Sequence, residues 1–297
     1  MITGTEPPVI FVLAAHKKNN MPVPYPALKL QRLPANTQGR DLVVGDVHGC
    51  LEDLLIALQM LEFNEHTDRL LSVGDLIDRG PNSRECAELI YKPWFYAVKG
   101  NHEDMMIETL LRNSSTHRNT WLGNGGIWMH SEDRTALTDL AGDLDKLPLV
   151  IVVGEGKDRF NIVHAEIKHC VDYKRVKVTD QMIDRWVFDD SEEDDMMWGR
   201  TIISNGHPTF PPPDDQLWHD VDDMSLTFVG HTPVRDTVFV QKQLYIDNGA
   251  VFGVAGRNSS HDNKLVIASP HEKCVYQYIM VTREMYRREF SELQQLS

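Results

Sequence analysis

Five short clusters of glycine, aspartate, asparagine and histidine recur along the chain, and each follows a short apolar run. The clusters are Gly45-Asp46-Val47-His48-Gly49, Gly74-Asp75, Gly100-Asn101-His102, His164 and Gly230-His231. They offer carboxylate, amide and imidazole side chains without a thiolate. Such a donor set suits Mn, Fe or Zn better than Ca or a structural cysteine-type zinc site. The clusters therefore predict a metal site.

Six of these side chains are candidate ligands, which is more than one ion with an open coordination position can use. They are Asp46, His48, Asp75, Asn101, His164 and His231. A pair of ions sharing one carboxylate would use all six. Two ions held roughly 3.5 to 4 Å apart can activate a bridging water as hydroxide and clamp the oxygens of an in-line displacement at phosphorus. Phosphate-ester hydrolysis is the natural reaction.

The apolar run before each cluster is typical of a short buried strand. The runs are DLVV, LLSV, PWFYAV, NIV and LTFV. Loops at the carboxyl ends of strands converge on one edge of an open α/β sheet, so we expect the clusters to meet there. Strand-helix alternation in the first half predicts parallel pairing, and the strand-rich sequence beyond residue 225 predicts antiparallel or mixed pairing.

Three segments between the clusters carry local signals. Apolar residues at three-to-four spacing predict a helix with one buried stripe at Leu51, Leu54, Leu55, Leu58 and Leu61. Asn82 and Glu85 have the spacing of a capping box for the next helix. The run DDSEEDD, residues 189–195, is interpreted as a solvated loop, with selection of basic peptide segments as the alternative.

Composition narrows the classes of protein. A formal charge of −14 over 297 residues argues against broad nucleic-acid binding, which needs clustered Lys and Arg. No run approaches the length of a membrane span. Four dispersed cysteines without a CxxC pair indicate reduced thiols in a cytoplasmic protein. We interpret Trp121, Trp128 and Trp198 as packing residues, since no basic patch surrounds them.

The motifs GDVHG, GDLIDRG and GNHE, followed by single histidines in VHA and GHT, resemble the phosphoprotein phosphatase family of metallophosphoesterases. The longer stretches LLSVGDLIDRG, ECAELI, PWFYAVKGNHEDMMI, GHTPV and YIDNGAVFG are similar to the bacteriophage lambda type branch and its bacterial relatives. One four-residue motif is a weak signal, but five in order with strand-like flanks are strong. The resemblance covers roughly residues 40–253.

The resemblance implies an α/β fold, a four-layer α/β/β/α sandwich of mixed sheets with the metal site at the carboxyl ends of strands. It implies a Pro-rich arm over 1–39, a calcineurin-like metallophosphoesterase domain over 40–285 and a tail over 286–297. The first ion would be held by Asp46, His48 and Asp75. Asp75 would bridge to the second ion, which Asn101, His164 and His231 would complete.

The resemblance also implies roles in the reaction. His102 would be the general acid, and Asp78 would orient it. Phosphate would be bound by Arg79, Arg200 and Asn101. Attack by a hydroxide between two divalent ions, Mn²⁺ or else Fe or Zn, would need no phosphoenzyme, so Cys50 is not required as a nucleophile.

Three functions follow from these expectations. The first is hydrolysis of phosphoserine, phosphothreonine and also phosphotyrosine in phosphorylated proteins or peptides. The second keeps the site but changes the substrate to a dinucleoside polyphosphate of the diadenosine tetraphosphate type, cleaved symmetrically. The third is a catalytically silent scaffold that binds a phosphorylated partner, which the complete ligand set disfavours.

Overall fold

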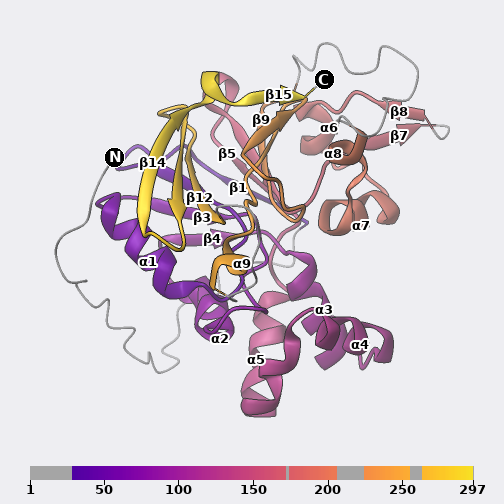
Figure 1. Ribbon diagram of the computed structural model, residues 1–297. Helices are drawn as coiled ribbons and strands as arrows, with labels where there is room; N and C mark the ends of the chain where they lie inside the picture. Colours follow the sequence, from indigo (N-terminus) through magenta and orange to yellow (C-terminus); the bar gives the residue numbers. More distant parts are fainter. Residues whose placement is uncertain (1–28, 172–173, 206–223, 255–262, 297) are drawn as a thin grey trace.

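The computed structural model describes residues 29–171, 174–205, 224–254 and 263–296, and within these ranges two β-sheets pack face to face (Figure 1). Sheet A contains, in spatial order, β14 (Glu284–Glu289), β13 (Cys274–Ile279), β12 (Lys264–Ser269), β2 (Asp41–Val44), β3 (Arg69–Ser72) and β4 (Phe95–Ala97). Sheet B contains β1 (Leu30–Leu33), β5 (Val150–Val153), β6 (Phe160–Val163), β9 (Leu226–Val229), β11 (Gln243–Tyr245), β10 (Val238–Val240) and β15 (Gln294–Leu296). A small two-stranded antiparallel sheet pairs β7 (His169–Val171) with β8 (Lys174–Val176).

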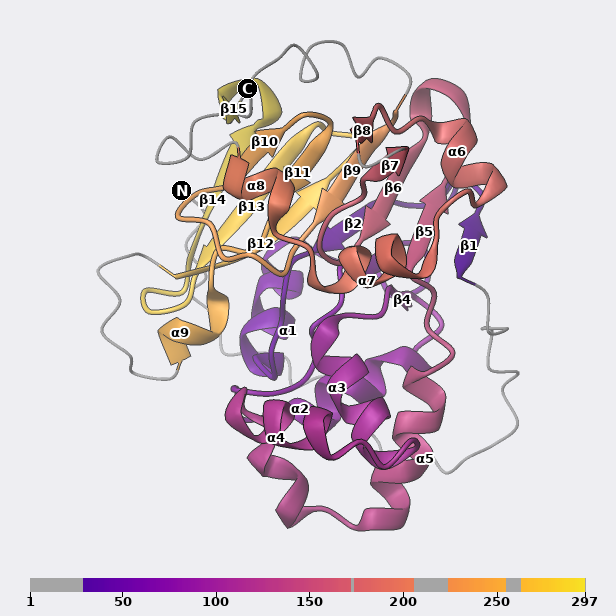
Figure 2. The same ribbon diagram turned by 90° about the vertical axis from the view of Figure 1, so that its right-hand side faces the viewer.

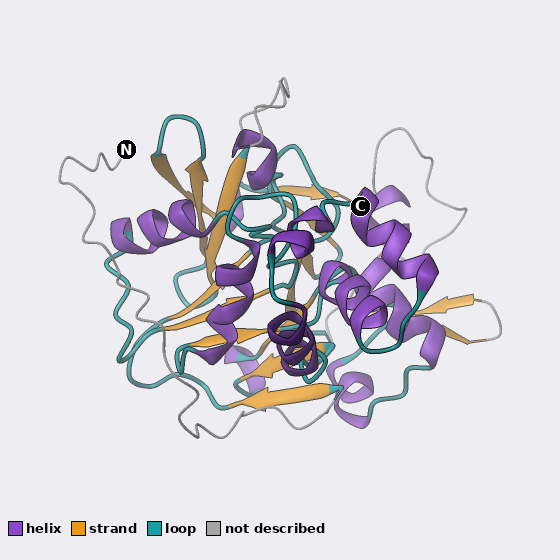
Figure 3. Ribbon diagram, turned by 90° about the horizontal axis from the view of Figure 1, so that it is seen from below, coloured by secondary structure: helices purple, strands orange, loops and turns teal. Residues whose placement is uncertain are grey.

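Helices cover both outer faces of the sheet pair. The first group is α1 (Leu51–Met60), α2 (Ser83–Ala87), α3 (Asn101–Leu110), α4 (Ser115–Gly123) and α5 (Arg134–Leu144), with the 3₁₀ turns η1 (Glu88–Tyr91) and η2 (Gly126–Ser131). The second group is α6 (Asp180–Arg185), α7 (Asp190–Trp198) and α8 (Thr201–Asn205). The remaining elements are α9 (Ala250–Val254), η3 (Gly156–Asp158) and η4 (Phe290–Glu292). Figure 2 shows α2 to α5 grouped at one end of the sheets, and Figure 3 shows helices on both sides of the strands.

Alternating apolar side chains build the layers, because successive residues of a strand point to opposite faces. In β2, Leu42 and Val44 pack with the first group of helices, whereas Val43 packs between the sheets. In β5, Val152 packs with the second group of helices and Ile151 packs between the sheets. Burial on both faces explains why these runs read as continuously apolar. The expected four-layer α/β/β/α sandwich is confirmed.

Most local expectations hold. The strands β2, β3 and β4 are parallel, and β12, β13 and β14 are antiparallel, both as predicted. In α1, Leu51, Leu54 and Leu58 are buried. The capping box at Asn82 is wrong, because the Asn82 side chain makes no capping hydrogen bond to α2.

The acidic run at 189–195 is not a loop, so that prediction is wrong. It forms the start of α7, where Asp189 accepts the Glu192 N–H at 2.9 Å and Glu192 accepts the Asp189 N–H at 3.2 Å. Acidic residues in a first helical turn are stabilised by the positive end of the helix dipole. Glu193 and Asp195 also form ion pairs with Lys29 and Lys168.

Both sheets extend past the expected domain limits. Within the expected arm, residues 1–28 lie outside the described part of the chain, whereas β1 pairs in parallel with β5. At the other end, β14 runs through the expected boundary at 285, and β15 pairs in parallel with β10. No helix within the described ranges is long and apolar enough to cross a membrane.

Candidate metal centre

All five polar clusters converge, but they come from both sheets. Those after β2, β3 and β4 belong to sheet A, and those after β6 and β9 belong to sheet B. The expectation of one sheet edge is therefore wrong, since the site lies where the carboxyl ends of two sheets meet. Two hydrogen bonds join the sheets there: His164 Nδ1 to the Val73 carbonyl at 2.7 Å, and the His231 N–H to the Asp46 carboxylate at 3.1 Å.

One group of donor atoms surrounds a single point. Donor atoms of Asp75, His164 and His231 lie within 4.8 Å of one another. The Asn101 Oδ1 atom lies 3.0 Å from His164 Nε2 and 2.9 Å from His231 Nδ1. Turning the amide would let its NH₂ donate to both imidazoles. As placed, an oxygen and two ring nitrogens face each other around one point, and such a set of acceptors could hold a cation.

A second group shares Asp75 with the first. Donor atoms of His48, Asp75 and His102 lie within 4.8 Å of one another. His48 Nε2 is 3.5 Å from Asp75 Oδ2 and 4.0 Å from Asp46 Oδ2. Asp75 belongs to both groups, so its carboxylate lies between the two sets of donor atoms.

Backbone carbonyls select the tautomers of two histidines. His48 Nδ1 lies 2.8 Å from the Ile77 carbonyl, and His164 Nδ1 lies 2.7 Å from the Val73 carbonyl. A carbonyl only accepts, so each Nδ1 carries the hydrogen and each Nε2 presents a lone pair. Burial lowers the pKa of both rings, and burial together with nearby His164 lowers the pKa of His231 to about 2. Neutral imidazoles are the form that binds metals.

Buried carboxylates make the site electrostatically costly without cations. Burial, followed by the negative charges of Asp247 and Asp75, raises the pKa of Asp46 well above its usual range. Burial also raises the pKa of Asp247 to about 6. Divalent ions would relieve this repulsion. The donor set, the tautomers and the charges therefore fit a pair of divalent ions.

Five residues of the site have a strained backbone. Among the non-glycine residues in the left-handed region are His48 (φ 44°), Asp75 (φ 51°), Asp78 (φ 75°), Arg79 (φ 68°) and His231 (φ 64°). Non-glycine residues rarely adopt this conformation, and such residues cluster at functional sites where the surrounding structure enforces them.

His102 and Asp78 form a hydrogen-bonded pair beside the candidate ligands. His102 Nδ1 lies 2.6 Å from Asp78 Oδ2, and both residues are buried. Burial lowers the pKa of His102, but the charge of Asp75 and the bond to Asp78 outweigh it, so the pKa is raised. The Nε2 atom of His102 is buried without a hydrogen-bond partner in the described structure. A protonated imidazole with a free N–H facing the centre could act as an acid.

The two predicted arginines lie at the same site. Arg79 Nη1 donates to His48 Nε2 at 2.6 Å, so it occupies the lone pair that a metal would need. Arg79 must therefore turn aside when an ion binds His48. Arg200 is exposed and donates to Thr232 at 3.2 Å, and its positive charge contributes to lowering the pKa of His231.

Two buried glutamates hold the site loops, and neither was selected from the sequence. Glu103 accepts the N–H groups of Asp75, Leu76 and Gly100, each at 2.9 Å. Glu166 accepts those of Thr201 at 2.9 Å and Ile202 at 2.7 Å, next to Arg200. Both follow a predicted ligand within two residues, in GNHE and HAE, which is the signal that could have identified them.

Close approaches explain two of the glycines. A Cβ at Gly230 would lie 2.0 Å from Asp46 Oδ1, and a Cβ at Gly100 would lie 2.4 Å from Asp75 Oδ1.

All four cysteines are unpaired. Burial raises the pKa of the Cys50 thiol to about 12, which keeps the thiol protonated.

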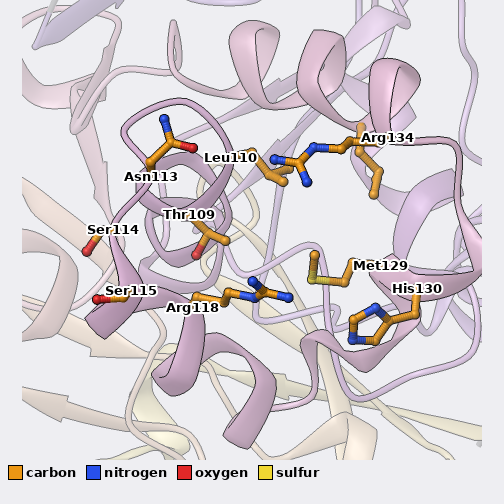
Figure 4. Close-up of a pocket in the computed structure, with 10 residues that line it drawn as sticks. Thr109, Leu110, Asn113, Ser114, Ser115, Arg118, Met129, His130 and Arg134 are labelled. Atoms are coloured by element: carbon orange, nitrogen blue, oxygen red, sulfur yellow. The ribbon is translucent and has the colours of Figure 1, made fainter.

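A separate pocket of about 350 Å³ lies between α3, α4, η2 and α5 (Figure 4). Its lining includes Arg118, His130 and Arg134 but none of the predicted ligands and no carboxylate. With one imidazole, two guanidinium groups and no carboxylate, this pocket offers a poor ligand set for divalent ions.

Comparison with known proteins agrees with this geometry. The serine/threonine-protein phosphatase 1 of Salmonella typhimurium is 32% identical over 229 residues, covering 75% of this chain and 92% of that protein. The asymmetrical bis(5'-nucleosyl)-tetraphosphatase PrpE of Anoxybacillus flavithermus is 26% identical over 231 residues, covering 71% and 86%.

A solved structure of a serine/threonine phosphatase from Saccharomyces cerevisiae matches with a TM-score of 0.53 and 16% identity, covering 90% of this chain and 85% of that one. That match supports the fold alone. Residues 40–235 match the family described as calcineurin-like phosphoesterase. The chain therefore belongs to the calcineurin-like phosphoesterase family, with bacterial serine/threonine-protein phosphatases among its relatives.

Proposed function

We propose that this protein is a metal-dependent phosphoprotein phosphatase that hydrolyses phosphoserine and phosphothreonine monoesters, and phosphotyrosine as well. The observation that carries the proposal is the convergence of the six candidate ligand side chains beside the His102–Asp78 pair. A metal site alone would support binding, but an adjacent acid aimed at the same point supports cleavage.

The ligands proposed for the two ions are Asp46, His48, Asp75, Asn101, His164 and His231. Divalent ions held there, Mn²⁺ or else Fe or Zn, would neutralise phosphate charge and lower the pKa of coordinated water. The phosphoryl oxygens would be held by Arg79, Arg200 and Asn101. The two arginines suit this role because a guanidinium offers two parallel N–H groups to a phosphate.

His102 would donate the proton on Nε2 to the leaving oxygen of the substrate. Asp78 keeps Nδ1 protonated and holds the ring in place through the 2.6 Å hydrogen bond. A serine alkoxide is a poor leaving group, so this proton transfer matters most for phosphoserine and phosphothreonine. The four unpaired cysteines support action in the reducing cytoplasm.

The second candidate is hydrolysis of a dinucleoside polyphosphate. The PrpE relative supports it, because its name describes that reaction and it matches most of this chain. The phosphatase proposal is favoured by the higher identity and wider coverage of the Salmonella relative. The same site serves both candidates, so the substrate must be measured.

The test compares a phosphoserine peptide, a phosphotyrosine peptide and diadenosine tetraphosphate as substrates of the metal-loaded protein. Asp75→Asn removes the shared carboxylate charge, and Asp158→Asn, an exposed residue of η3, is the matched control. We expect release of phosphate from the peptides that is lost in Asp75→Asn and retained in Asp158→Asn. Preference for the dinucleotide would move the protein to the second candidate. Lack of turnover on all three would contradict both.

A further inference from the structure

The Asp78 carboxylate is held by two tryptophans as well as by His102. Trp121 Nε1 lies 2.9 Å from both carboxylate oxygens, and Trp128 Nε1 lies 2.6 Å from Oδ1. The Oδ2 atom also accepts a hydrogen bond from His102 Nδ1 at 2.6 Å. An indole N–H can only donate, so the carboxylate is the acceptor in each bond. Asp78 is fully buried, and these donors replace the water it lacks.

A tight turn brings both indoles to the same carboxylate. Trp121 belongs to α4 and Trp128 to η2, and their rings meet edge to face with centroids 6.2 Å apart. Gly126, in η2, lies where a Cβ would be 2.5 Å from Trp121 Nε1. Gly125 has a φ of 110°, and a Cβ there would lie 2.7 Å from the backbone nitrogen of Arg79. The turn is therefore fitted to Trp121 and to the loop that carries Asp78 and Arg79.

The geometry points to a task beyond packing. Asp78 could rotate about its side-chain torsions, and rotation would move Oδ2 away from His102. Two neutral donors on the outer side of the carboxylate oppose that rotation without adding charge. His102 then keeps Nε2 directed at the centre, where it lies 3.8 Å from Asp75 Oδ2.

We propose that Trp121 and Trp128 are positioning residues that fix the Asp78–His102 pair for proton transfer to the leaving group. This inference rests on the proposed function, because it assigns the pair the role of acid. It predicts that loss of an indole N–H slows reactions only in proportion to their need for a proton. A packing role would instead slow all substrates alike.

The test uses Trp128→Phe, which removes the N–H and keeps an aromatic ring at a half-buried position. Turnover is measured on a phosphoserine peptide and on 4-nitrophenyl phosphate, whose phenoxide leaves without a proton. We expect kcat on the peptide to fall about tenfold and kcat on the aryl ester to fall less than about twofold. Trp121→Phe should show the same pattern with a larger loss of stability, since Trp121 is fully buried.

Trp94→Phe is the matched control. Trp94 is buried, and its Nε1 donates to the Glu65 carboxylate at 3.0 Å, away from the metal centre. It should lose stability and keep both activities. The double variant His102→Asn with Trp128→Phe should be no slower on the peptide than His102→Asn alone, because the indole acts through His102.

Equal losses of Trp128→Phe on both substrates, or full additivity in the double variant, would overturn the inference. Failure of the proposed function is recognised separately. In that case wild-type protein turns over neither substrate, or His102→Asn itself shows no dependence on the leaving group.

Discussion

The Glu103 carboxylate accepts the backbone N–H of Asp75 at 2.9 Å, which ties the start of α3 to the loop that carries Asp75. The same carboxylate accepts N–H groups of Leu76 and Gly100. Loops after β3 and β4 are thereby held in one geometry by a residue that would not itself contact an ion.

Glu103→Gln should loosen this link. Glutamine turns one acceptor oxygen into an NH₂ group that faces backbone N–H donors, so buried N–H groups lose their partner. We expect a loss of roughly 1 to 3 kcal/mol in the free energy of unfolding and weaker metal binding. Denaturant unfolding and metal content measure the two effects. Glu108→Gln, on the same helix but paired with Arg112 near the surface, is the control and should change stability by less than about 0.5 kcal/mol.

Arg79→Lys should weaken phosphate binding. Lysine keeps the charge but loses the planar fork, so we expect kcat/KM to fall roughly ten- to a hundredfold and inhibition by inorganic phosphate to weaken. Arg84→Lys is the comparison, because Arg84 pairs with Glu88 and Glu132 away from the ligands. Similar kinetics for the two variants would exclude Arg79 from phosphate binding.

Gly230→Ala should damage the centre through Asp46. The new Cβ would lie 2.0 Å from Asp46 Oδ1 and 2.6 Å from Val73 Cγ2, so the carboxylate must move. Displacement of about 1 Å in a catalytic site can lower activity about a hundredfold. Gly142→Ala, in α5 with open space around it, should instead raise stability by roughly 0.5 to 1 kcal/mol. Steady-state kinetics measure the activity of the two variants, and thermal unfolding measures their stability. Full activity of Gly230→Ala would contradict this prediction.

Asp68 lies outside the candidate metal centre and should make the stability of the protein depend on pH. Burial raises the pKa of Asp68, but hydrogen bonds from Arg40 outweigh it, so the pKa lies below its ordinary value of 3.8. The contribution of Asp68 to the free energy of unfolding is therefore complete above pH 3.8. It is lost as the pH falls through the lower pKa that Asp68 has in the folded state. Asp68→Asn should be less stable than wild type at pH 7, and the difference should shrink toward pH 3. Urea unfolding at both pH values measures this, and a constant difference would contradict it.

The candidate ligands could be selected from the sequence because each signal is local. Asp46, Asp75 and His164 lie one to three residues after the ends of apolar strands, and short motifs preserve that order. The sequence could not show that His164 and His231 extend from a second sheet, because sheet membership depends on pairing between distant strands.

Side chains joined by long-range hydrogen bonds were missed for the same reason. Trp121 and Trp128 lie 43 and 50 residues from Asp78, and only folding reveals their shared acceptor.

The acidic run at 189–195 was misread because like charges suggested a solvated loop. Its D-x-x-E spacing, from Asp189 to Glu192, was the better signal for a helix start.

Counting the bound ions tests most directly whether the junction of the two sheets holds a two-ion centre. Equilibrium dialysis against Mn²⁺ after chelation should give two ions per chain, with phosphopeptide hydrolysis rising as the second ion binds. His231→Ala should leave one ion bound and little activity, because it removes a ligand of one ion only. Full activity with one ion per chain, or two ions retained by His231→Ala, would contradict the account.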